Sequence, residues 1–215
     1  MRALDCRTWG QQVYLYRVLS RLLEQGRIHK VQDNRRGGQQ ILYAGSPDRT
    51  NWQHSLGAAD LKIGVACSCR ALGYEYCWSS ANLKAITGSA ADGLLIFEKL
   101  DADGARTRRL VIMEYQRTKL SCQRAAEKLR RYTSLEDELQ RAFDVTHVYI
   151  LASFDLWPLG YSERWLEALV REVADCNLYV TSHVRLLDVP APDILTASIW
   201  YRYGNDGLVP IFLKE

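Results

Sequence analysis

Two acidic residues flank strand-like segments near the middle of the chain. Asp92 stands just before the apolar run 93–99, and Glu114 lies in the run 109–116, beyond a polar turn that contains Asp-Gly. An acid at the start of one strand and another on its hairpin partner can meet at one end of a sheet. Carboxylates that converge can hold a hard cation such as Mg²⁺, together with water and a phosphate oxygen. The alternative is an ordinary hairpin with charged ends.

The hairpin lies within an alternating pattern of helices and strands. Apolar spacing predicts a helix over 54–73, closing at Gly73, and then a short strand over 74–78. Within the hairpin, side-chain alternation places Glu114 and Gln116 on one face of the strand and Tyr115 on the other. Beyond it we expect one helix over 121–143 with Ser121 as its N-cap, a strand over 146–154, a helix over 162–174 and a final strand over 177–184. This order predicts an α/β sheet.

The predicted helix over 121–143 carries a row of basic residues. Arg124, Lys128 and Arg131 recur at i, i+4 and i+7, which places them together on one side of the helix. Such a row can contact the phosphates of a nucleic acid. It can equally be a solvated face without a ligand, and the spacing does not separate these two interpretations.

The first fifty residues predict part of a winged helix. We expect an amphipathic helix over 11–26, a strand over 27–31, a Gly-rich turn over 32–38 and a return strand over 39–45. Side chains suited to phosphates and base edges are Tyr14, Arg17 and Arg21 on the helix, Lys30 on the first strand, and Arg35 and Arg36 at the turn. An ordinary solvated helix and hairpin would also carry arginines.

This N-terminal segment is short for a complete winged helix. A helix-turn-helix needs helices ahead of its recognition helix, yet only about ten residues precede this one. The segment is therefore truncated, completed by a second subunit, or no longer a DNA reader. Its uncovered apolar face would invite a partner, so we predict a homodimer through this segment.

Composition and charge limit the classes of protein to which this chain can belong. The 215 residues suit one large domain or a large domain with a small appendage, and 47% hydrophobic with 25% charged residues is typical of a soluble globule. A net charge of +3 makes any nucleic-acid role depend on where the charges sit. Without a membrane-length apolar run or a signal core, we expect a cytoplasmic protein that does not enter membranes. The six cysteines lack paired CxxC spacing, so Cys67 and Cys69 are interpreted as buried free thiols rather than zinc ligands.

Four segments of the chain share features with one known family. They are LSRLLEQGRIHKV with the following hairpin, HSLGAADLKIGV, ADGLLIF, and MEYQRTK followed by AAEKLRRY. Together they resemble the replication-relaxation family of plasmids and other mobile elements. The likeness spans roughly residues 9–185. It implies a winged-helix DNA-binding segment over 1–50 joined to a PD-(D/E)XK nuclease-like α/β domain over 51–215, with a mixed sheet flanked by helices.

The resemblance also implies roles for individual residues. Asp92 and Glu114 would be the metal ligands, with Asp60 as an additional acid, and the cofactor of an active member would be Mg²⁺ or Mn²⁺. Gln116 takes the place of the nuclease lysine but cannot supply a positive charge. Lys119 or Lys128 would then supply that charge from the segment that follows. Ala-Asp also stands where the family has Pro-Asp.

Three functions follow as hypotheses. The first is a DNA-binding protein of a mobile element, acting on double-stranded DNA, whose nuclease-like domain does not cut. The second is a Mg²⁺-dependent DNA endonuclease that uses Asp92 and Glu114. The third is a protein-interaction module that binds no nucleic acid. The C-terminal segment is expected to cover the core, with Pro192 and Asp193 in a loop rather than in a nuclease motif.

Overall fold

The computed structural model describes residues 19–25, 29–33, 40–44, 52–79, 83–100, 104–117, 120–156 and 160–211. The chain divides into two compact units, residues 1–56 and 57–215, and each is described by itself. The division falls at residue 56, whereas the expected boundary was residue 50.

The first unit contains a helix and a hairpin. Residues 19–24 are helical, and β1 (His29–Asp33) pairs antiparallel with β2 (Gln40–Ala44). Of the candidate nucleic-acid contacts in this unit, Arg21 is exposed on the helix and Lys30 is described only in its main chain. Tyr14, Arg17, Arg35 and Arg36 lie outside the described residues. The winged helix and the homodimer stay predictions.

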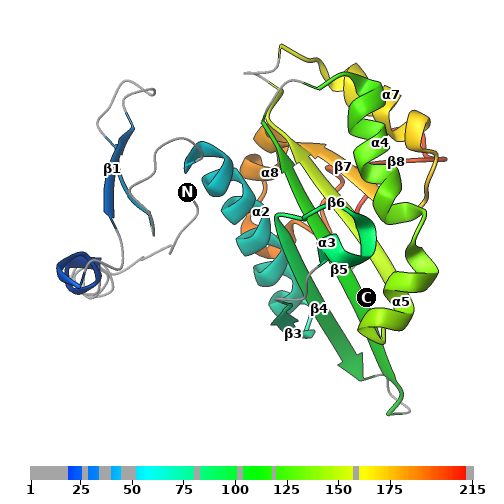
Figure 1. The fold of residues 1–215 in the computed structure, drawn as a ribbon, viewed down its shortest axis with the longest axis horizontal. Helices are drawn as coiled ribbons and strands as arrows, with labels where there is room; N and C mark the ends of the chain where they lie inside the picture. The colour runs from blue at the N-terminus through cyan, green and yellow to red at the C-terminus, as the bar shows by residue number, and fades with distance from the viewer. Residues whose placement is uncertain are drawn as a thin grey trace. The chain divides into compact units, whose positions relative to one another are not determined.

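The second unit is built on a six-stranded mixed sheet with the order β3-β4-β5-β6-β7-β8 (Figure 1). The strands are β3 (Glu75–Trp78), β4 (Gly93–Leu100), β5 (Arg106–Gln116), β6 (His147–Phe154), β7 (Leu178–Ser182) and β8 (Tyr201–Arg202). The first three strands are antiparallel, β5, β6 and β7 are parallel, and β8 returns antiparallel. The expected α/β class and the β4–β5 hairpin are confirmed.

Helices cover both faces of this sheet (Figure 1). The helices α4 (Cys122–Thr133), α5 (Glu136–Phe143) and α7 (Glu163–Val173) lie on one face, and α2 (Trp52–Ala71) and α8 (His183–Asp188) lie on the other. Side chains of β5 alternate between two cores: Leu110 and Ile112 pack in the core that includes residues of α4 and α7, and Val111 and Met113 in the core that includes residues of α2. The short helix α3 (Leu83–Thr87) adds Leu83 to the first core.

The C-terminal segment covers α2, as expected. The hydroxyl of Ser68 donates to the main-chain oxygen of Ala191 at 3.0 Å and accepts from the amide of Leu195 at 3.2 Å. Trp200 is fully buried in the same core. The 3₁₀ helix η1 (Ala191–Asp193) contains the Pro-Asp pair, away from the β4–β5 hairpin in the chain. The helix α2 is therefore enclosed between the sheet and this segment.

The single helix expected over 121–143 is wrong, because the structure has two helices there. Ser121 caps α4 as expected, accepting from the amide of Arg124 at 3.2 Å. The helix ends at Thr133, and Leu135 leaves the helical conformation with φ −118° and ψ 23°. The hydroxyl of Thr133 takes the main-chain oxygen of Arg130 as its partner, and the acidic run 136–138 favours a new helix N-terminus. The apolar periodicity continues across the break.

Two other expectations need correction. The strand expected to be the last one ends at Ser182, whose hydroxyl accepts from the amide of Arg185 and so begins α8, and β8 follows later in the chain. Of the two central cysteines, Cys69 is buried, and desolvation raises its pKa to about 12, whereas Cys67 is only half-buried. Both are free thiols. Within the described part of the chain, no helix is long and apolar enough to span a membrane.

Candidate functional site

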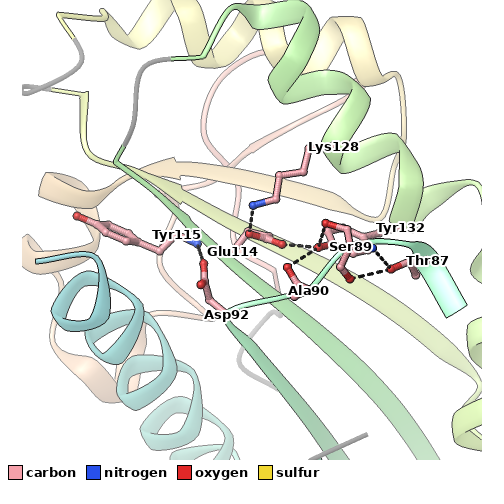
Figure 2. A network of polar contacts seen from close by, with 8 residues as sticks. All are labelled: Thr87, Ser89, Ala90, Asp92, Glu114, Tyr115, Lys128 and Tyr132. Atoms are coloured by element: carbon pink, nitrogen blue, oxygen red, sulfur yellow. Dashed lines mark hydrogen bonds and ion pairs between the residues drawn. The ribbon is translucent and has the colours of Figure 1, made fainter. Parts of the chain in front are cut away.

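The β4–β5 hairpin brings Asp92 and Glu114 to the same end of the sheet. Gly93 at the start of β4 pairs with Met113 of β5, and the amide of Asp92 donates to the oxygen of Met113 at 3.0 Å. Asp92 therefore stands beside the strand segment that carries Glu114. Figure 2 shows both residues together with their polar partners.

The Glu114 side chain is buried beneath α4, with 3% of the residue exposed. Its Oε2 lies 2.6 Å from Nζ of Lys128, and its Oε1 accepts a hydrogen bond from the hydroxyl of Tyr132. Lys128 and Tyr132 are four residues apart and so project from the same side of α4. One helix thus supplies a partner for each oxygen of the carboxylate (Figure 2).

Burial and the neighbouring polar groups shift the pKa of Glu114 in opposite directions. Desolvation raises the pKa of Glu114, and the Lys128 ammonium and the Tyr132 hydroxyl lower it, while the Asp92 carboxylate raises it again. Burial and the neighbouring Glu114 also raise the pKa of Tyr132, so its hydroxyl keeps the proton that it donates.

Asp92 is held by the main chain of β5. Its Oδ2 accepts from the amide of Tyr115 at 2.8 Å. The loop before Asp92 is tied to α4 as well, since the Tyr132 hydroxyl lies 3.2 Å from Oγ of Ser89 and 3.3 Å from the oxygen of Ala90 (Figure 2). Both acids therefore sit in fixed positions.

The structure does not bring Asp60 to Glu114. Asp60 lies on α2, which packs on the face of the sheet that carries Tyr115, whereas Glu114 points to the α4 face. Its Oδ2 is 3.6 Å from Nε2 of His183, a residue that the sequence did not single out. Asp60 and Glu114 therefore lie on opposite faces of the sheet, and the role of Asp60 as an additional acid stays a prediction.

The other residues expected at the site are Gln116, Lys119 and the basic row of α4. Gln116 is half-buried at the last position of β5, and its main-chain oxygen accepts from Asp155. Lys119 lies outside the described residues. The row of basic residues on α4 divides: Lys128 turns inward to Glu114, while Arg124 and Arg131 are exposed.

Tyr132 is the residue of this site that sequence reasoning missed. Its position in the apolar repeat of the helix indicated only a core residue, and its ring is fully buried as that repeat implies. The available signal was its spacing of four residues from Lys128, which was expected to supply charge to the site. A tyrosine there combines an apolar ring with a polar hydroxyl that must find a buried partner.

The residues present do not fit a divalent metal ion in this arrangement. Two carboxylates are suitable ligands for Mg²⁺ or Mn²⁺, but both oxygens of Glu114 are already engaged and the side chain is almost inaccessible. Among the described residues, no group of three or more His, Cys, Asp or Glu side chains can hold an ion.

Comparison with family models, curated proteins and solved structures found no match to this chain.

Proposed function

We propose that this chain is a double-stranded-DNA-binding protein of a plasmid or other mobile element, with a nuclease-like domain that does not cut. The observation that carries the loss of cutting is the ammonium of Lys128, which lies 2.6 Å from the Glu114 carboxylate. The carboxylate that the resemblance implies as a metal ligand is thus paired with a side chain of the protein itself. The mobile-element context rests on the sequence resemblance.

The order of elements supports the nuclease-like interpretation. The helix α2 precedes three antiparallel strands, β3 to β5, with the short helix α3 between β3 and β4, and the helices α4 and α5 lead to the parallel strand β6. Asp92 before β4 and Glu114 in β5 lie at the same end of the sheet, which supports the PD-(D/E)XK resemblance. Lys128 on α4 provides a positive charge beside Glu114, which Gln116 cannot.

The exposed arginines of α4 support binding to DNA. Arg124 and Arg131 are both exposed and lie seven residues apart, on either side of Lys128 along the helix. Their guanidinium groups are suited to phosphate oxygens. Of the neighbouring basic residues, Arg130 is engaged by Glu172 in an ion pair of 2.6 Å.

Replacing both exposed arginines, in Arg124→Ala/Arg131→Ala, is expected to weaken duplex binding at every sequence. Each phosphate contact contributes about 0.9 to the slope of log K against log salt, so the slope should fall by about 1.8. Fluorescence anisotropy with a labelled duplex between roughly 50 and 200 mM salt measures this change.

The matched control is Arg106→Ala/Arg141→Ala. It removes the same two charges from exposed positions at the other end of the domain, because Arg106 begins β5 and Gln116 ends it, about 30 Å apart. The control should bind like the wild type. An equal loss of duplex affinity in both variants would show a general attraction between charges rather than contacts made by α4. If the wild type does not bind duplex DNA at low salt, only the protein-interaction module remains of the three hypotheses.

A second candidate is a Mg²⁺-dependent endonuclease, favoured by the meeting of Asp92, Glu114 and Lys128 at one end of the sheet. We expect no cleavage of supercoiled, linear or branched DNA with Mg²⁺ or Mn²⁺ above the level of Asp92→Ala. Gel electrophoresis of the products tests this. Cleavage that both Asp92→Ala and Glu114→Ala abolish would establish the enzyme and refute the non-cutting proposal.

A further inference from the structure

A row of aromatic rings with interleaved cations crosses the α2 face of the sheet. This aromatic row consists of Tyr74 before β3, Lys99 on β4, Arg109 on β5, His147 and Tyr149 on β6, Tyr179 on β7 and Arg202 on β8. Arg109 pairs with Phe97, a core residue of the α2 face, and paired residues of adjacent strands share a face. Tyr149 pairs in the same way with Val111. Since Arg109 lies five residues before Glu114 in β5, about 17 Å away, the row crosses the other end of the sheet.

The cations of the aromatic row are held against its rings. The guanidinium carbon of Arg109 lies 5.8 Å from the centroid of the Tyr74 ring, and Nζ of Lys99 lies 5.5 Å from the same centroid. The guanidinium carbon of Arg202 lies 5.5 Å from the centroid of the Tyr179 ring. Cation–π attraction therefore fixes three positive charges along the row.

Two rings of the row face solvent between these charges. His147 is exposed and pairs with Arg109, and its ring centroid lies 6.4 Å from that of Tyr149. Tyr149 is half-buried, and its ring centroid lies 6.3 Å from that of Tyr179, a residue that is 4% exposed. The buried ring thus supports the other two, which are open to a flat ligand.

The charge around these rings favours an anionic ligand. Burial raises the pKa of Tyr149, Arg109 and Arg202 lower it, and Tyr74 and Glu136 raise it. The carboxylate of Glu136 already accepts hydrogen bonds from two side-chain amides. The aromatic row itself contributes three cationic side chains.

We propose that the aromatic row binds a single-stranded nucleic acid, with bases stacked on His147 and Tyr149. The cations of the row hold the neighbouring phosphates. Every base has a flat face that stacks on an aromatic ring, whereas a duplex keeps those faces within its own stack. The inference goes beyond the proposed function, because it concerns the α2 face of the sheet and the arginines of α4 take no part in it.

The test is fluorescence anisotropy of the full chain with labelled oligothymidylate and oligouridylate, two strands that form no duplex with themselves. The wild type is expected to bind at least one of them at low salt, and the tighter of the two identifies DNA or RNA as the strand. His147→Ala should weaken that binding about fivefold or more, because it removes the stacking of one base. His147→Phe keeps a ring at this exposed position and should bind like the wild type.

Further variants test the second ring and the charges. Tyr149→Leu should lose affinity as His147→Ala does, while Tyr149→Phe retains the ring and the affinity. Lys99→Gln should lower the slope of log K against log salt by about 0.7, the value for one phosphate of a single strand. Lys84→Gln removes the same charge from an exposed position on α3 and should leave the slope unchanged.

Three results overturn the inference. They are a wild type that binds neither strand, unchanged binding by both His147→Ala and Tyr149→Leu, and an equal change of slope in Lys84→Gln and Lys99→Gln. Duplex binding is measured separately: His147→Ala should retain it, and Arg124→Ala/Arg131→Ala should retain single-strand binding. Failure of one inference is therefore distinguishable from failure of the other.

Discussion

Gly57→Ala is expected to destabilise the α/β domain by about 2 kcal/mol, as a typical cost of overpacking. A Cβ at this position would lie 2.0 Å from Cζ of Tyr115 and less than 2.5 Å from two further ring atoms. The ring cannot easily yield, because Tyr115 is 2% exposed, its hydroxyl lies 3.3 Å from Asp155, and it packs against His183. The clash outweighs the higher helix propensity of alanine, which favours the variant by ~1 kcal/mol.

The same helix contains a matched control for this prediction. A Cβ at Gly64 would lie 2.1 Å from Cδ1 of Ile194, which is the end of a flexible side chain. Gly64→Ala should therefore cost clearly less than Gly57→Ala in urea denaturation. In Gly57→Ala/Tyr115→Leu the two effects should not add, because the smaller side chain removes the clash. A Gly57→Ala variant as stable as the wild type would contradict the close contact between α2 and β5.

Lys128→Met is expected to destabilise the domain by ~2–3 kcal/mol at neutral pH. Removing one partner of a fully buried ion pair costs about 3–5 kcal/mol, because the other charge is left unpaired. The lower value applies here because the side chain of Lys128 is 32% exposed and already partly screened by solvent. Urea denaturation of the two proteins at neutral pH measures the difference.

The pH dependence of this loss has a definite sign. Burial raises the pKa of Glu114 above its ordinary value, and removing the ammonium raises it further. A raised folded-state pKa means that stability is highest where Glu114 is protonated and falls as the pH rises through that pKa. The deficit of Lys128→Met should therefore be largest at neutral pH and shrink on acidification, since a protonated carboxyl group needs no ammonium.

A second substitution separates this explanation from a simple packing defect. Glu114→Gln/Lys128→Met removes the buried charge as well, and glutamine can still accept from the Tyr132 hydroxyl. The double variant should recover most of the lost stability at neutral pH. A deficit that does not change with pH, or that persists in the double variant, would show that Lys128 contributes through packing alone.

Several features of this fold follow from local patterns in the chain. The two apolar runs on either side of the Asp-Gly turn specify the β4–β5 hairpin, and Ser121 marks the start of α4. These signals succeed because a strand or helix face depends on periodicity that is present in a few consecutive residues. The placement of Asp92 near Glu114 also follows, since it requires only that adjacent strands pair.

The helix break at 133–136 shows where such patterns end. The apolar residues Tyr132 and Leu139 are seven apart, so a single continuous helix satisfies their periodicity. The hydroxyl of Thr133 and the amide of Ser134 both donate to the main-chain oxygen of Arg130 and close the first helix instead. A side-chain hydroxyl can take a main-chain hydrogen-bond partner from the helix, and apolar spacing carries no information about this competition.

The chemistry of the site depended on packing between segments that are distant in sequence. Residue type and spacing identified Asp92 and Glu114 as a pair and Lys128 as a source of charge. Only the tertiary structure showed that the Lys128 ammonium pairs with the Glu114 carboxylate and that the Tyr132 hydroxyl donates to the same group. It also showed that Asp60 lies on the opposite face of the sheet, beside His183. Periodicity determines the face on which a side chain stands, whereas its partner across the core depends on how separate elements approach one another.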